Sequence, residues 1–244
     1  MRTVKLTIAF DGTRYEGWQS QKKENTLQEI FEKVLARILG EKTAVISSSR
    51  TDSGVHALGL VAHFRTKSAL PDPKIKDALN FYLPRDILVR SAQTARPGFH
   101  ARYHAKSKVY RYSIWMSRTR PLFEAAHVLW LPHRLDLRRM RKAAAHFIGR
   151  RDFSAFRDSG DEKVSYVRTV KRLAIRRKKE LVQIDIEADG FLRHMVRIVV
   201  GTLMEAGKGK LKPEAIPSIL KSKDRKKAGP TAKAMGLMLL RVKY

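Results

Sequence analysis

The order of predicted strands and helices constrains the fold of this chain most, because the same order occurs twice. In both halves it is strand, helix, strand, strand, helix, strand. The strands are expected at 3–10, 43–46, 58–64, 87–92, 108–116, 164–176, 181–188 and 236–243, and the helices at 27–38, 71–82, 135–147 and 191–206. This order predicts an α+β fold of two similar lobes, 1–105 and 106–244, with helices packed on a mainly antiparallel sheet and a central cleft.

The charge of the chain favours a polyanionic partner. Lys and Arg number 51 against 23 Asp and Glu, a formal net charge of +28 over 244 residues. Nucleic acid is the first candidate, because each neutralised phosphate releases counterions. An anionic membrane surface is the alternative, but no apolar run approaches the roughly 20 residues that span a bilayer. The chain has no cysteine, and its start lacks a signal-peptide core, which favours a cytoplasmic protein.

Basic residues gather in one predicted hairpin of the second lobe. A second basic region follows at 208–227. Each region alone is typical of a solvated surface, but together with the net charge they form a candidate RNA-binding surface. The hairpin residues are Arg168, Lys171, Arg172, Arg176, Arg177, Lys178 and Lys179.

A polar loop at 48–57 carries the strongest candidate for chemistry. The Asp-Ser-Gly step at 52–54 favours a tight turn with Asp52 at its apex, because Gly accepts a positive φ. Arg50 lies two residues earlier, and an extended approach to the turn would place both side chains on the same side. There the cation would keep the Asp52 carboxylate ionised.

Three interpretations of this loop compete. An ionised and fixed Asp52 can act as a nucleophile on a nucleotide. A metal site of Asp52, His56 and His63 is less favoured, because the spacing of Asp52 and His56 converges only on a helix and Gly54 indicates a loop. The third interpretation is an RNA-binding protein without activity, in which Asp52 only caps the turn. The residues alone leave the choice between catalysis and binding open.

Five further side chains stand out. Trp18 is expected to be exposed in the loop that follows the first strand. Tyr110 and Tyr112 share one face of a strand. Aromatic core packing is the ordinary interpretation and suits Tyr112, whereas Tyr110 can offer its ring to a base, but the sequence alone does not separate the two tyrosines. Arg197 lies in a helix that is apolar almost all round, so it is expected to meet a buried acid, with Asp52 as the candidate, or an anion. Arg193, four residues earlier, is expected beside it on the helix.

Motifs along nearly the whole chain resemble those of the TruA family of tRNA pseudouridine synthases. The most specific is Arg-Thr-Asp-Ser-Gly-Val-His-Ala at 50–57. Phe10 and Ser49 depart from the family pattern, where Tyr and Gly are usual, and Met238 stands where an aromatic is common. The other matching segments are 10–21, 99–105, 108–112, 190–203, 223–232 and 236–237.

The resemblance implies an enzyme of the pseudouridine synthase fold that converts uridine to pseudouridine at positions 38, 39 and 40 of the tRNA anticodon stem-loop. It implies Asp52 as the nucleophile, Tyr110 stacked on the target base, Arg197 paired with the carboxylate and Arg50 helping to open the site. It also implies a homodimer that needs no cofactor and no metal.

Overall fold

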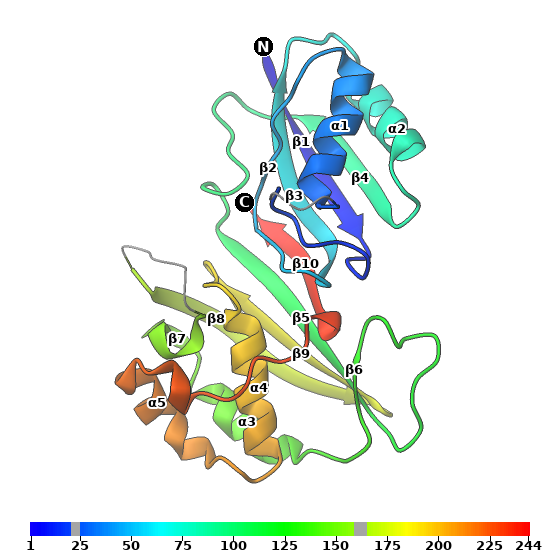
Figure 1. Cartoon of the computed structure of the whole chain (residues 1–244). Helices are drawn as coiled ribbons and strands as arrows, with labels where there is room; N and C mark the ends of the chain where they lie inside the picture. Colours follow the sequence, from blue (N-terminus) through cyan, green and yellow to red (C-terminus); the bar gives the residue numbers. More distant parts are fainter. Residues whose placement is uncertain (21–24, 159–164) are drawn as a thin grey trace. The chain divides into compact units, whose positions relative to one another are not determined.

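The computed structural model describes residues 1–20, 25–158 and 165–244, and these form two compact units (Figure 1). Unit 1 contains Met1–Lys106 and Met238–Tyr244, and unit 2 contains Ser107–Leu237. The sequence-based division gave the last strand to the second lobe. The structure joins that strand, β10 (Leu237–Lys243), to unit 1, because it pairs in parallel with β3 (His56–Thr66). Gly59 permits this contact, since a Cβ there would lie 2.6 Å from the Leu240 carbonyl oxygen.

The sheet of unit 1 has the strand order β4-β1-β3-β10, with β2 paired to β3. Strands β1 (Arg2–Phe10), β2 (Ile46–Ser47) and β4 (Ile87–Thr94) are antiparallel to their neighbours. The alternation read from the sequence is observed in β1, whose even-numbered residues from Val4 to Phe10 are buried.

Two helices complete unit 1 and agree with the sequence-based prediction. Helix α1 (Leu27–Leu39) buries Leu27, Phe31 and Leu35, and it ends at Gly40, whose φ of 68° suits glycine. Helix α2 (Asp72–Tyr82) has a proline in its first turn, contacts α1 and packs on β4. The helices thereby cover the sheet that carries the loop at 48–57.

The sheet of unit 2 has the strand order β5-β9-β8-β7, with β6 parallel to β5. Helix α3 (Leu137–Ala145) packs on α4 (Met195–Gly207) and on β8. Helix α5 (Ile216–Ser222), β6 and β7 are short elements that the sequence pattern did not predict. The strands are β5 (Ser107–Met116), β6 (Leu129–Leu131), β7 (Gly149–Asp152), β8 (Val167–Lys178) and β9 (Leu181–Ala188).

The α+β class and the mainly antiparallel pairing of the ten strands are confirmed. The cleft between lobes stays a prediction. Part of the predicted strand at 164–176, residue 164, lies outside the described residues.

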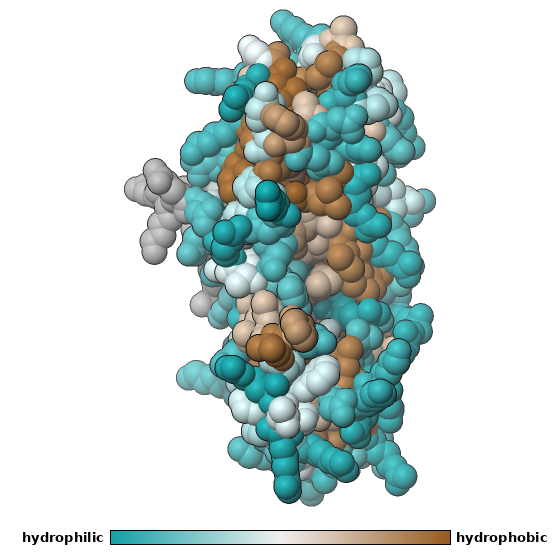
Figure 2. All heavy atoms as spheres, turned by 90° about the vertical axis from the view of Figure 1, so that its right-hand side faces the viewer, coloured by the Kyte–Doolittle hydropathy of each residue, from teal (hydrophilic) through white to brown (hydrophobic). Residues whose placement is uncertain are grey.

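Within the described ranges, no helix has the length and apolar character needed to cross a membrane. Figure 2 shows hydrophilic side chains over much of one face of each unit, around smaller hydrophobic areas.

Helix α4 begins later than predicted. His194 adopts a left-handed conformation, with φ of 57°, and forms the N-cap, so the first helical residue is Met195. Arg193 therefore precedes the helix, and the prediction that Arg193 and Arg197 are neighbours on one helix face is wrong. Only Arg197 and Glu205 of α4 are not buried, which confirms a helix that is apolar almost all round.

Candidate functional site

The loop that contains Asp52 forms the expected tight turn. The backbone N–H of Val55 donates to the Asp52 carbonyl oxygen at 3.2 Å, and Gly54 has a φ of 73°. Asp52 itself is half-buried, whereas Thr51 and Val55 on either side are buried. The turn is thus anchored on both sides of the candidate nucleophile.

Residues 11–18, which we call the N-terminal brace, hold the backbone of the Asp52 loop. The Trp18 N–H donates to the Thr51 carbonyl at 3.1 Å. On the other side of Asp52, the Tyr15 carbonyl accepts from the Gly54 N–H and from the Ser53 hydroxyl, each at 3.3 Å. Because the backbone before and after Asp52 is bonded to the same segment, the brace restricts where the carboxylate can lie.

Two glycines allow the brace to approach this closely. A Cβ on Gly12 would lie 2.0 Å from the Val55 carbonyl oxygen, and one on Gly17 would lie 2.4 Å from the Thr51 carbonyl oxygen. Gly17 also has a φ of 93°, a conformation that L side chains rarely adopt. Any side chain at either position would displace the Asp52 loop.

Asp86 fixes the brace to the start of β4. Its carboxylate accepts from the Tyr15 hydroxyl at 2.6 Å and from Nη2 of Arg14 at 2.7 Å. Burial alone would raise the pKa of Asp86, but these hydrogen bonds outweigh it and the pKa lies below its usual value. Burial, and then the bond to Asp86, raises the pKa of Tyr15, which keeps its hydroxyl a donor. The sequence gave no signal for this contact, because Tyr15 and Asp86 are 71 residues apart.

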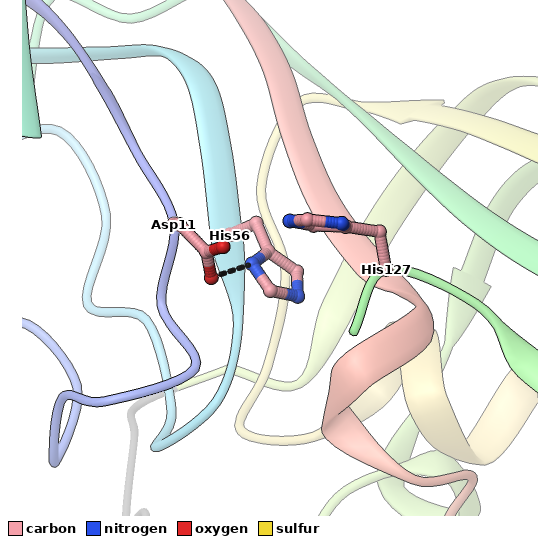
Figure 3. Close-up of side chains that lie close together, drawn as sticks. All are labelled: Asp11, His56 and His127. Atoms are coloured by element: carbon pink, nitrogen blue, oxygen red, sulfur yellow. Dashed lines mark ion pairs between the residues drawn. The ribbon is translucent and has the colours of Figure 1, made fainter. Parts of the chain in front are cut away.

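His56 links the brace to the first residue of β3 (Figure 3). Its Nδ1 lies 3.1 Å from Oδ1 of Asp11 and 3.0 Å from the Gly12 nitrogen, and the side chain is buried. A neutral ring accepts the Gly12 N–H at this nitrogen, whereas a protonated ring donates to Asp11. Both states join residues 11–12 to the strand that follows the Asp52 loop.

The placement of the histidines does not support the metal site of Asp52, His56 and His63. Nδ1 of His56 lies against the brace, as described above. Nδ1 of His63 accepts from the Ala101 N–H at 3.2 Å. Burial, followed by the nearby charge of His100, lowers the pKa of His63 to about 4, so its ring is neutral near pH 7.

Arg50 does not hold Asp52 as the sequence led us to expect. Its side chain is exposed, and it forms no ion pair with any residue in the described ranges. The two-residue spacing is a reliable guide only within a strand, and Arg50 lies outside both strands that flank the loop. Its role in opening the site stays a prediction.

Trp18 is buried, so the expectation of an exposed tryptophan is wrong. Only 1% of its surface is accessible, and its ring stacks on Phe31 of α1 with 5.8 Å between centroids. The indole packs the brace onto the core of unit 1. Polar neighbours on both sides of Trp18 obscured this in the sequence.

The structure separates the two tyrosines of β5. Tyr112 is fully buried, its hydroxyl donates to the Lys233 carbonyl at 2.8 Å, and burial raises its pKa. Tyr110 is 7% exposed, and its ring meets Phe191 edge-to-face at 5.1 Å. Tyr112 is therefore a core residue, as expected, and Tyr110 is an aromatic ring held in a fixed orientation by a second one.

Arg197 lies in the first turn of α4, where the C-terminal segment holds it. Its Nε donates to the Ala232 carbonyl at 2.7 Å, and the Ala232 N–H donates back to the Arg197 carbonyl at 3.1 Å. Gly201 lets this segment pack on the helix, since a Cβ there would lie 1.7 Å from the Pro230 carbonyl oxygen. Arg197 and Asp52 belong to different units, so their pairing stays a prediction.

The residues of the basic hairpin are all exposed except Arg168, which is half-buried, and their role in RNA binding stays a prediction. Beyond an irregularity at Lys171, residues Arg172, Arg176 and Lys178 alternate with the buried Leu173 and Ile175. Three members have partners nearby. Arg176 lies 3.9 Å from Asp185, which Arg111 also binds through two nitrogens at 2.7 and 2.9 Å. Arg177 donates to the Lys179 carbonyl, and Arg168 donates to the Val167 and Ser165 carbonyls.

Comparison with known proteins identifies the family. The family model described as tRNA pseudouridine synthase matches residues 6–104 and 143–244. Three similar proteins are named tRNA pseudouridine synthase A: those of Acetivibrio thermocellus, a Thermoanaerobacter species and Geotalea uraniireducens are 47%, 46% and 45% identical, over 100% of both chains. A chain of a solved Cbf5-Nop10-Gar1 complex aligns with 97% of this chain over 48% of its own length, at 11% identity and a TM-score of 0.39. The chain belongs to the tRNA pseudouridine synthase family.

Proposed function

We propose that this enzyme, an isomerase that converts uridine to pseudouridine in tRNA, acts at positions 38, 39 and 40 of the anticodon stem-loop with Asp52 as its nucleophile. The observation that carries the proposal is the fixed position of Asp52. The N-terminal brace bonds the backbone on both sides of it, and the Asp52 side chain is only half-buried. A carboxylate held in this way can react without first being ordered.

The reaction needs few groups from the protein. The bond between C1′ of the ribose and N1 of uracil breaks, the uracil turns, and a bond forms between C1′ and C5. The proton on C5 is lost and N1 gains one, so the substrate and product have the same composition. Asp52 can attack the uracil ring, attack the sugar or stabilise the sugar cation. No redox equivalent or phosphate is consumed, so we propose that the enzyme needs no cofactor and no metal.

The other site residues would act on the base and on the carboxylate. We assign Tyr110 to stack on the extruded uracil, which its fixed ring supports. We assign Arg197 to pair with Asp52, which its incomplete burial in a helix that is apolar almost all round supports. Arg50, exposed and without an ion pair in the described residues, is available to a phosphate while the base leaves its helix, a step that costs a few kcal/mol. We expect the enzyme to be a cytoplasmic homodimer.

The substitution Asp52→Asn tests the role of the nucleophile. It removes the negative charge but keeps the size of the side chain, so pseudouridine formation should fall below detection while affinity for an unmodified tRNA transcript changes less than about threefold. Product is measured by single-turnover assay and affinity by filter binding. The control is Asp77→Asn on α2, an exposed carboxylate far from the loop in sequence, which should keep full activity. If Asp52→Asn loses binding as much as product, Asp52 is a structural acid.

A further inference from the structure

The segment from Arg96 to Lys106, which we call the connector, has an unusual charge pattern. No acidic residue occurs from 87 to 123, and the connector itself contains Arg96, Arg102 and Lys106 together with His100 and His104. The whole connector belongs to unit 1, whereas the basic hairpin belongs to unit 2. It therefore calls for an explanation of its own.

Two buried residues fix the connector to the sheet. Phe99 and Ala101 are 6% and 0% exposed and pack with Val61 of β3. The Ala101 N–H donates to His63, and its carbonyl accepts from the Tyr244 hydroxyl at 2.7 Å. With these two side chains inside, the residues that follow, from Arg102 to His104, are exposed.

The two connector histidines bond the backbone of the turn that they belong to. Nδ1 of His100 accepts from the N–H groups of Arg102 and Tyr103, each at 3.2 Å, and Nδ1 of His104 accepts from the His100 N–H at 3.1 Å. A neutral imidazole that accepts at Nδ1 carries its proton on Nε2. Each ring therefore keeps one N–H donor for another partner, and the turn is ordered before any ligand binds.

Three arginines of this surface have no acidic partner among the described residues. In the described part of the chain, the exposed Arg65, Arg96 and Arg102 form no ion pair, whereas Arg2 of the same unit is paired with a carboxylate. Arg65 and Arg102 lie close enough to His100 to disfavour its charged form: after burial and the charge of His104, they contribute to lowering its pKa. Positive side chains that lie close together on an ordered turn repel one another, and a bound anion reduces this repulsion.

Tyr103 gives this surface its second property. It is 76% exposed, and its ring stacks on His100 with 4.2 Å between centroids and 26° between planes. One face of the ring is thus supported by the imidazole, and the exposure of the residue leaves its remaining surface to solvent. An exposed ring beside unpaired cations suits a polymer in which phosphates alternate with flat bases.

We propose that the connector, together with Arg65, is an RNA-contact surface of unit 1. Arg65, Arg102 and the Nε2–H groups of His100 and His104 bind phosphates, and Tyr103 stacks on an unpaired base. The proposal rests on the proposed function only in taking RNA as the partner. It concerns affinity alone, so it can be tested on protein that makes no product.

The first test measures the salt dependence of affinity for an unmodified tRNA transcript. Arg65→Ala with Arg102→Ala removes two proposed phosphate contacts, so the slope of log K against log salt should fall by about 1.4 to 1.8. The control, Lys42→Ala with Arg85→Ala, removes two exposed charges from unit 1 outside this surface and should change the slope by less than about 0.5. Equal slopes for the two double variants would overturn the proposal.

The second test separates stacking from charge. Tyr103→Ala should weaken tRNA binding by about 5- to 160-fold, because stacking on an aromatic side chain contributes roughly 1–3 kcal/mol per base. Tyr103→Phe keeps the ring and should bind within about twofold of the unchanged protein. If both variants bind tRNA as before, or if the arginine variants lose binding to anionic lipid vesicles and not to tRNA, the surface does not contact RNA.

Discussion

Gly17→Ala tests whether the N-terminal brace sets the position of Asp52. Its matched control is Gly149→Ala in unit 2. The two glycines have φ of 93° and 98°, so alanine is strained to a similar degree at both, by about 1–2 kcal/mol. They differ in space: a Cβ at Gly149 has no atom within 4 Å, whereas one at Gly17 lies 2.4 Å from the Thr51 carbonyl oxygen and 3.1 Å from the Asp52 carbonyl carbon.

The structure gives the size of the expected effect. An ordinary contact begins near 3.4 Å, so the Thr51 carbonyl must move by about 1.0 Å away from the new methyl group. It is a backbone atom next to Asp52 and cannot rotate aside. A displacement of about 1 Å in a catalytic group costs on the order of 100-fold in rate. Gly17→Ala should therefore lower the single-turnover rate about 100-fold, and Gly149→Ala by less than about twofold.

Stability and rate are measured on the same preparations. Urea unfolding should show that both variants are folded at the assay temperature, with the Gly17 variant less stable than the Gly149 variant because it adds the clash to the strain. The rate is that of pseudouridine formation with enzyme in excess over tRNA. Comparable rates for the two folded variants would refute the idea that the brace positions Asp52.

Three further predictions concern residues of unit 1. Tyr15→Phe removes a hydrogen bond to the Asp86 carboxylate and should cost about 1.5–3 kcal/mol of unfolding free energy, measured in urea. Trp18→Ala removes the buried indole that stacks on Phe31 and should lower the unfolding free energy by about 3–5 kcal/mol in the same measurement. The folded pKa of His63, about 4, lies below its ordinary value of 6.5. The unfolded chain therefore binds the proton first, stability should fall as pH drops from 6.5 towards 4, and His63→Gln should lose less between pH 7 and pH 5.

Local sequence patterns predicted the helices and strands of this fold, because each helix or strand depends mainly on residues that are close together in the sequence. The apolar spacing of α1 and its stop at Gly40 are visible in a 14-residue window, and so is the turn at Gly54. The brace is different. Its contact between Tyr15 and Asp86 joins positions 71 residues apart, and no local pattern reports such a pair.

The errors have equally specific causes. Helix α4 starts late because His194 adopts a left-handed conformation, which its residue type does not require. Trp18 looked exposed because its neighbours are polar, although the indole packs on Phe31. The last strand belongs to unit 1 because β10 pairs with β3. These strands are far apart in the sequence, and the repeated order of elements gave no sign that they pair. Family motifs named Asp52, but only the structure shows what holds its loop.

The most direct test of the central claim is the position of the product. Purified enzyme, with chelator and without added cofactor, is incubated with an unmodified tRNA transcript that carries uridines at positions 38, 39 and 40 and elsewhere. Pseudouridine is then mapped by carbodiimide-stop sequencing, with Asp52→Asn in parallel. We predict stops at positions 38 to 40 with the unchanged protein and none with the variant. Product at other positions, or product that survives Asp52→Asn, would contradict the account.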